Sequence, residues 1–240
     1  MLNYAELKPK TKEFLAATSL KVEEFEALVP AFKNAYEEAY LSKTTADGEV
    51  RKRKVGGGVK GRLASIEDKL LFILVYVKTY PLQTMHGLQF GLSQPQTNEW
   101  IQRLLPVLRE AMQAKGMVPE RDGSQFTAHP TLDIEGADLI LDGLERPRQR
   151  PKDADQQTAS YSGKSKSHCD KNLVIVHEHT KQVIYLSSTT PVHVHDKKLA
   201  DDAHITYPDD ATLTQDTGFQ GYQPVNVLVY QPKKNRKESL

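Results

Sequence analysis

The chain has 240 residues, a formal net charge of +1 and 38% hydrophobic residues, which is enough for one large or two small domains. The near-zero net charge excludes a polycation, and no apolar run approaches the roughly 20 residues of a membrane span. The single cysteine, Cys169, excludes an internal disulfide framework and is typical of a reducing compartment. We therefore expect a soluble cytoplasmic protein with no membrane partner.

Residues 1–50 are predicted to form N-terminal helices. Apolar side chains recur at helical spacing from Phe14 to Tyr40, and Pro30 interrupts the pattern, so a kink or break is expected there. Residues 51–62 follow as a linker with six cations, four glycines and no acidic residue. A segment of this composition cannot bury a core, so we predict a mobile basic arm.

Residues 63–115 are predicted to form a helix-turn-helix domain. Ser65 can cap a first helix. Gly87 and Gly91 follow, and a helix-turn-helix uses such small residues for close helix packing and for the positive φ of its turn. Ser93 then begins a second helix, with proline in its first turn and glutamine at the capping-box position. The alternative is an ordinary helical hairpin.

Polar side chains of the second helix and of the basic arm are the candidate contacts with DNA. Glutamine and asparagine can bind adenine edges in the major groove, and arginine can reach guanine or phosphate. The arm would add phosphate contacts that do not depend on sequence, unless it is only a solvated run of charge. The candidates are Gln94, Gln96, Thr97, Asn98 and Arg103 on the helix, which are expected to face outward, and Arg51, Lys52, Arg53 and Lys54 in the arm.

The remainder of the chain is predicted to be rich in strands. Residues 116–136 form a polar connector, and residues 137–240 form the second domain. A short helix is expected from Lys197 to Ala203, between the third and fourth strands. The candidate strands are 137–142, 171–177, 182–188, 212–216 and 225–230.

Two acidic residues follow apolar segments of this second domain. The run 139–141 ends at Asp142-Gly143, and Asp216 with a nearby glycine ends a second such pattern. The simplest interpretation is a turn, because Asp-Gly is a common turn dipeptide. In a sheet, however, two such residues can meet at one edge, where paired carboxylates suit Mg²⁺ or Mn²⁺. Two metal ions about 4 Å apart can hold the attacking and leaving oxygens of a phosphodiester.

Cations that closely follow Asp142 would then hold phosphate groups near the acidic pair. The alternative is an exposed edge strand, which basic side chains also protect from wrong pairing. The cations are Arg146, Arg148, Arg150 and Lys152.

Asp196 is a third acidic candidate. It could equally cap the helix that begins at Lys197, and the residues alone slightly favour this alternative. Two histidine pairs, 177 with 179 and 193 with 195, have the spacing of one strand face and could bind zinc. Exposed histidines without a ligand are the commoner explanation of such pairs.

Five segments resemble bacterial DDE transposases of the insertion-sequence-five type, which are related to the Harbinger transposases. In chain order they are SIEDKLLFILVYVKTYP, LILDGLERPRQRPKD, YSGKSKSHCDKNLVIV, VHDKKLADD and QDTGFQGY. The resemblance covers residues 20 to 235. It implies an α + α/β fold class, with an N-terminal helical region that contains the helix-turn-helix and then an RNase H-like domain with a mixed sheet.

The resemblance also implies an activity and partners. The activity is Mg²⁺-dependent cutting of element ends, with water as the nucleophile, followed by joining of the free 3′-hydroxyl to target DNA. The partner is double-stranded DNA, both the terminal repeats of the element and the target, in the bacterial nucleoid. A homo-oligomer stays open.

Carried over to this chain, the family pattern makes Asp142 the first catalytic residue, on the first strand. Asp196 and Asp216 compete as the second. An RNase H-like core places its second acidic residue at the end of the fourth strand, and counting strands puts Asp216 there. We favour Asp142 and Asp216 as catalytic residues and ligands of Mg²⁺ or Mn²⁺, with Asp196 as an auxiliary ligand.

The third acidic residue of the family, a glutamate on a later arginine-rich helix, has no counterpart here. Glu238 lies in a basic polar tail too close to Asp216, so we reject it. The RNase H-like domain is therefore predicted to be incomplete, and activity of this chain as an enzyme stays open. The alternative is a non-catalytic helix-turn-helix regulator derived from a transposase.

The tail offers an explanation for the missing glutamate. The family leads us to expect a continuation much like QPKKKPKGEL, whereas the chain has QPKKNRKESL. Codons that contain A AAA AAC, on which ribosomes can slip backward by one base, would relate the two tails. We expect residues after Asn235 to be out of frame.

Overall fold

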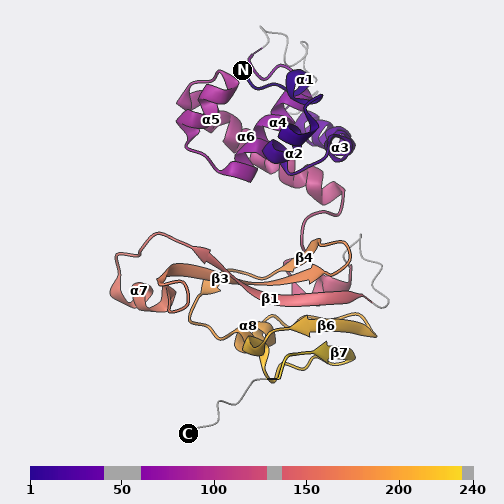
Figure 1. Cartoon of the computed structure of the whole chain (residues 1–240), viewed down its shortest axis with the longest axis vertical. Helices are drawn as coiled ribbons and strands as arrows, with labels where there is room; N and C mark the ends of the chain where they lie inside the picture. The colour runs from indigo at the N-terminus through magenta and orange to yellow at the C-terminus, as the bar shows by residue number, and fades with distance from the viewer. Residues whose placement is uncertain (41–60, 129–136, 234–240) are drawn as a thin grey trace, which may run out of the picture. The chain divides into compact units, whose positions relative to one another are not determined.

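The computed structural model describes residues 1–40, 61–128 and 137–233 (Figure 1). The chain divides into two compact units, Met1–Lys115 and Gly116–Leu240. The cations Arg51–Lys54 of the predicted arm and the proposed frame change near Asn235 lie outside the described residues. No helix in the described ranges is long and apolar enough to cross a membrane.

The first unit is helical, and its N-terminal helices share one apolar core with the predicted helix-turn-helix. The largest core side chains include Phe14, Phe25 and Phe32 from residues 1–40, and Phe72 and Ile101 from the later helices. The helices are α1 Tyr4–Leu7, α2 Thr11–Thr18, α3 Val22–Tyr40, α4 Ile66–Thr79, α5 Gln83–Phe90 and α6 Gln94–Ala114.

Pro30 lies inside α3, which continues through it to Tyr40. Of the two outcomes expected at this proline, a break is therefore wrong. Proline removes one backbone hydrogen bond from a helix. The side chains of Phe25, Leu28 and Phe32, on both sides of Pro30, are buried in the core, and this burial stabilises the helix on each side of the proline.

Local signals end and begin the helices of the helix-turn-helix as the sequence predicts. The Ser65 hydroxyl accepts a hydrogen bond from the backbone N–H of Asp68 at 3.0 Å, which caps α4. Ser93 and Gln96 form a capping box at the start of α6. Gly91 ends α5 with a φ of 68°, the left-handed conformation that glycine adopts without strain.

His86 is a buried ionisable group in this core. Its side chain on α5 is fully buried, and its ring lies against the rings of Phe72, Tyr76 and Phe90. Neither ring nitrogen has a hydrogen-bond partner within the described residues. Burial disfavours the charged imidazolium and lowers the pKa of His86 to about 4.

We expect the first unit to lose stability as the pH falls from 6.5 to 4. Over this range the folded state keeps His86 neutral, whereas the unfolded chain binds a proton below the ordinary pKa of 6.5. The neutral state of His86 costs no stability above pH 6.5. By pH 4, the unfolding free energy of the first unit should have fallen by about 3 kcal/mol. Urea unfolding followed by the fluorescence of Trp100, the only tryptophan, measures this loss.

The His86→Leu variant is the control for this prediction, because leucine fills the site without a titrating group. The difference in unfolding free energy between variant and wild type should change by about 3 kcal/mol between pH 6.5 and 4. Parallel pH profiles of the two proteins would contradict the buried, neutral histidine.

The second unit combines a sheet with short helices (Figure 1), and each predicted strand has a counterpart. The first strand is longer than predicted, because β1 and β3 pair as far as Pro147 opposite Cys169. The strands are β1 Asp138–Pro147, β2 Tyr161–Ser162, β3 Ser167–His177, β4 Val183–Leu186, β5 Thr190–Pro191, β6 Ala211–Gln215 and β7 Val227–Tyr230. The helices are α7 Ala154–Ser160 and α8 Asp196–Asp202, with the 3-10 turns η1 Gly123–Ala128 and η2 Thr217–Phe219.

The sheet is mixed, with the strand order β2-β3-β1-β6-β7 and with β4 and β5 also paired to β3. β3 runs antiparallel to β1, β4 and β5, whereas β1, β6 and β7 run parallel. A parallel connection needs a crossover, and α8 lies in the connection from β5 to β6. The pairing therefore changes from antiparallel to parallel at β1.

The core of the second unit lies on one face of this sheet. Leu139 and Leu141 of β1 and Leu213 of β6 are buried there with Leu199 of α8. Because side chains alternate along a strand, the residues between them lie on the opposite face. This opposite face exposes Leu144, Leu228 and Tyr230. Helices followed by a mixed sheet confirm the predicted α + α/β fold class.

Candidate active site

Asp142 lies within β1, and Asp216 directly follows the neighbouring parallel strand β6. The pairing of β1 with β6 ends with Leu141 opposite Gln215, and the two acidic residues come next. Leu141 and Gln215 are buried on the core side, so Asp142 lies on the other face of the sheet, and Asp216 follows Gln215 as the capping residue of η2. The fold thus brings two acidic residues that are far apart in the sequence to neighbouring backbone positions.

A backbone N–H orients each of these two carboxylates. Asp142 Oδ1 accepts a hydrogen bond from the N–H of Gly143 at 2.7 Å, and Asp216 Oδ1 accepts one from the N–H of Gly218 at 2.8 Å. Both acidic residues are exposed. They are therefore held in place while they stay accessible to a ligand from solvent.

Asp196 reaches this region from α8. Its Oδ1 accepts a hydrogen bond from the ammonium group of Lys171 at 2.8 Å, and Lys171 is buried in β3. The helix begins at Asp196, one residue earlier than predicted, and His195 is its capping residue. The alternative in which Asp196 caps the helix is therefore wrong, because its carboxylate is engaged by a lysine of the sheet.

The histidine pairs contact other parts of the unit. His179 Nε2 lies 3.0 Å from Asp138 Oδ2, and His193 Nδ1 donates to the backbone oxygen of Ala159 at 2.7 Å. Among residues 1–40, 61–128 and 137–233, no group of three or more His, Cys, Asp or Glu side chains could hold a metal ion. The zinc alternative therefore gains no support from these pairs.

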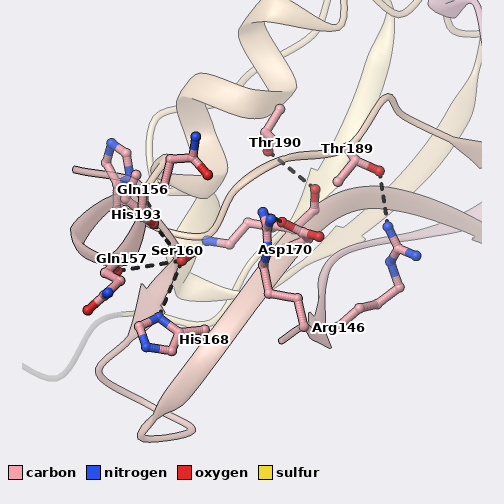
Figure 2. A network of polar contacts seen from close by, with 12 residues as sticks. Arg146, Gln156, Gln157, Ser160, His168, Asp170, Thr189, Thr190 and His193 are labelled. Carbon is pink, nitrogen blue, oxygen red and sulfur yellow. Dashed lines mark hydrogen bonds and ion pairs between the residues drawn. The ribbon is translucent and has the colours of Figure 1, made fainter. Parts of the chain in front are cut away.

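Arg146 is held beside the sheet by two side chains. Its Nε donates to Asn172 Oδ1 at 2.9 Å. Its Nη2 donates to Thr189 Oγ1 at 3.0 Å, the contact drawn in Figure 2. Asn172 is buried and in turn donates to the backbone oxygen of Ser187 at 2.9 Å. The exposed guanidinium of Arg146 is thus oriented by a buried amide that leaves its charge uncompensated.

The next two arginines are held in different ways. Arg148 forms an exposed ion pair with Asp170 at 2.8 Å, whereas Arg150 donates from Nε and Nη2 to Gln157 Oε1 at 3.1 and 2.8 Å. A neutral partner leaves the charge of Arg150 available to an anion, and a carboxylate offsets that of Arg148. Lys152 is exposed.

The edge-strand alternative also has a basis in the structure. β6 pairs with β1 only as far as Leu141, so the second half of β1 pairs with β3 alone. Within the described residues, one edge of β1 is therefore unpaired from Asp142 onward, and the basic residues that come after Asp142 lie along or just beyond this edge. Protection of an edge and contact with phosphate are compatible roles for the same side chains.

In the first unit, Gln94 and Asn98 lie on the outer side of α6. Gln83 of α5 links them, since its Nε2 donates to Asn98 Oδ1 at 3.0 Å and its Oε1 accepts from Gln94 Nε2 at 2.6 Å. These contacts order the first turns of α6. In helix-turn-helix proteins the corresponding part of the second helix meets the base edges.

Thr97 does not face outward, so this prediction is wrong. Its side chain is fully buried, and its hydroxyl donates to the backbone oxygen of Ser93 at 2.9 Å. Thr97 shares the buried stripe of α6 with Ile101 and Leu104. It packs against α5 where Gly87 leaves room for it.

Gln96 and Arg103 are exposed, as predicted, but both have contacts within the first unit. The Gln96 side chain accepts the backbone N–H of the capping residue at 3.0 Å. Arg103 pairs with Glu99 at 2.8 Å and lies over the rings of Trp100 and Tyr40. Arg103 therefore lies toward α3, away from the side of α6 that carries Asn98.

The sequence analysis did not identify two exposed polar residues of α6 or two buried polar residues of β3. Gln102 and Arg109 are exposed on α6, and the helical spacing of four residues from Asn98 to Gln102 could have identified the first. Lys171 and Asn172 are buried in β3. Two adjacent polar residues at the start of a predicted apolar strand were the available signal, because buried polar groups require partners.

Comparisons with known proteins agree in both units. Residues 61–114 match the helix-turn-helix of DDE superfamily endonucleases, and residues 141–239 match the DDE superfamily endonuclease domain. The chain is 25% identical over 199 residues to a probable transposase for the insertion sequence element IS702 of Microchaete diplosiphon, an alignment that covers 82% of this chain and 67% of the relative. No solved structure matches. With both domains present in chain order, the protein belongs to the DDE superfamily of transposases and endonucleases.

Proposed function

We propose that the chain is a transposase, or a truncated transposase, that binds DNA through its first unit and that in its complete form cuts DNA through its second. The placement of Asp142 in β1 and of Asp216 directly after the parallel strand β6 carries this proposal. Both residues lie within the region that matches DDE superfamily endonucleases. The relative, named as a probable transposase, supports the same class of reaction.

Mg²⁺ or Mn²⁺ fits the candidate site, because both cations prefer hard oxygen ligands and the two carboxylates are exposed. Asp142 and Asp216 would hold the metal, which when bound would stabilise charge on the reacting phosphate. Arg146 and Arg150 would bind neighbouring phosphates and orient the strand. Water and then a DNA 3′-hydroxyl would be the nucleophiles, so the protein would form no covalent bond to DNA.

We also propose that the sheet is RNase H-like. Its support is the order of the long strands: β1, β3 and β4 are antiparallel neighbours, and α8 then leads to β6, parallel to β1. Asp216 follows the fourth of these strands, as the family resemblance requires. The domain limits 1–50, 51–62, 63–115, 116–136 and 137–240, the insertion-sequence-five type, nucleoid association and a homo-oligomer stay predictions.

We expect Asn98→Ala to weaken binding to DNA that carries the inverted repeats flanking the gene. A side chain that binds a base edge contributes about 1–3 kcal/mol of discrimination, so affinity should fall about 10- to 100-fold. Gln113→Ala is the control, because Gln113 is exposed near the far end of α6. Fluorescence anisotropy at one fixed salt concentration measures both affinities. Equal affinities of the two variants would contradict a role of Asn98 in recognition.

Nicking of supercoiled DNA with these repeats tests the catalytic part of the proposal. A catalytically competent chain should cut at the repeat ends with Mg²⁺ or Mn²⁺ and should leave DNA without repeats intact. DNA binding with no cleavage in either metal would overturn a catalytic role of this chain. That result would favour the non-catalytic helix-turn-helix regulator, or a truncated transposase that acts as one.

A further inference from the structure

The carboxylate of Asp196 occupies a space that two glycines leave open. A β-carbon at Gly143 would lie 2.8 Å from Asp196 Oδ1, and one at Gly218 would lie 2.6 Å from Asp196 Oδ2. Gly143 directly follows Asp142, and Gly218 lies two residues after Asp216. Each acidic residue of the candidate site is thus followed by a glycine against which the same third carboxylate packs.

Gly218 also connects Asp196 with Asp216. A β-carbon at Gly218 would lie 2.9 Å from Asp216 Oδ1, and the N–H of Gly218 donates to that oxygen at 2.8 Å. The two carboxylates therefore approach the same glycine closely. Any larger residue at Gly218 would displace one of them.

Lys171 fixes Asp196 from the side of the sheet. Its Nζ donates to Asp196 Oδ1 at 2.8 Å and to the backbone oxygen of Val194 at 3.0 Å. Lys171 is only 7% exposed, and a buried ammonium needs such partners. The ion pair thus joins β3 and the start of α8 to the segments that follow Asp142 and Asp216.

We propose that Lys171 and Asp196 are positioning residues for the acidic pair. They hold the backbone that follows Asp142 and Asp216, and the N–H groups of this backbone orient the two carboxylates. The chemistry of the pair rests on the proposed function, whereas the positioning itself rests on the contacts above. The proposal replaces the auxiliary-ligand role that the sequence suggested for Asp196.

Binding of Mn²⁺ to the full chain, followed by electron paramagnetic resonance, separates the two roles. Lys171→Met removes a positive charge beside the site. If Asp196 were a ligand, the lost charge would strengthen Mn²⁺ binding. If it positions the other two carboxylates, binding should weaken about 10- to 100-fold, as for residues that support metal ligands. Lys171→Arg should restore part of the affinity, because it can restore the ion pair that holds Asp196.

Two glycine variants provide a matched pair. The methyl group of Gly143→Ala meets the movable end of the Asp196 side chain, so it should displace the carboxylate without unfolding the sheet. The same change at Gly163 meets no atom within 4 Å in the part of the chain that the structure describes. Gly143→Ala should weaken Mn²⁺ binding as Lys171→Met does, and Gly163→Ala should leave it unchanged.

Amide hydrogen exchange tests the positioning role without metal. In Lys171→Met and Gly143→Ala, the amides of residues 143 and 218 should exchange at least about 10-fold faster, while that of Leu213 should not change. A wild-type chain that binds no Mn²⁺ would contradict the proposed function, and exchange would still decide the positioning role. Unchanged exchange at both sites, or tighter Mn²⁺ binding by Lys171→Met, would overturn the proposal.

Discussion

Asp142→Asn and Asp216→Asn should each slow DNA nicking about 1,000-fold or more and leave DNA affinity unchanged. Asparagine keeps the size of the side chain but loses the negative charge that attracts a divalent cation. Affinity should persist because the candidate contacts of α6 belong to the other unit. Single-turnover nicking and fluorescence anisotropy with the same DNA measure the two properties separately.

Asp138→Asn is the matched control for this pair. Asp138 lies on the same strand and the same face as Asp142, and its carboxylate accepts hydrogen bonds from Thr212 and His179. These bonds, that of Thr212 first, lower the pKa of Asp138. Nicking by Asp138→Asn should stay within about 3-fold of the wild type, because the site is left intact. A loss as large as that of Asp142→Asn would argue against a specific metal pair.

Gly87→Val should destabilise the first unit by about 3 kcal/mol or more and abolish DNA binding. A β-carbon at Gly87 would lie 2.5 Å from the backbone oxygen of Leu92 and 2.6 Å from the hydroxyl of Thr97. Neither neighbour can move easily, because Leu92 donates to the backbone oxygen of Gly87 at 2.9 Å and Thr97 is fully buried. Overpacking of this kind separates the helices α5 and α6.

Urea unfolding followed by Trp100 fluorescence measures this loss in the first unit. Gly61→Val is the control, because a β-carbon at Gly61 meets no atom of the described residues within 4 Å. Its unfolding free energy should stay within about 0.5 kcal/mol of the wild type. Equal stability of the Gly87 and Gly61 variants would show that α5 and α6 do not pack as described.

Short-range patterns predicted the elements and selected the acidic candidates. The apolar run before Asp216 marked the end of β6, whereas β1 continues past Asp142 to Pro147, and counting strands selected Asp216 over Asp196 as the second candidate. The caps at Ser65 and Ser93 were equally predictable, because a cap depends on only four consecutive residues. These features need no knowledge of distant parts of the chain.

Features that depend on distant contacts could not be predicted. Thr97 faces inward because α5 presents Gly87 to it, and this partner becomes visible only when the two helices are packed. The engagement of Asp196 depends on Lys171 of another strand. The break that was one of the two outcomes expected at Pro30 is absent for the same reason, since core packing on both sides outweighs one lost hydrogen bond.

The central claim is that Asp142 and Asp216 together hold the catalytic metal. A change of metal preference tests this claim most directly. Cysteine at either position replaces a hard carboxylate with a softer thiolate, which binds Mn²⁺ better than Mg²⁺. The native Cys169 is buried, so it should not interfere. Nicking by Asp142→Cys and Asp216→Cys should be lost in Mg²⁺ and recovered in part in Mn²⁺. This account would be contradicted if either variant were fully active in Mg²⁺, or if neither variant regained activity in Mn²⁺.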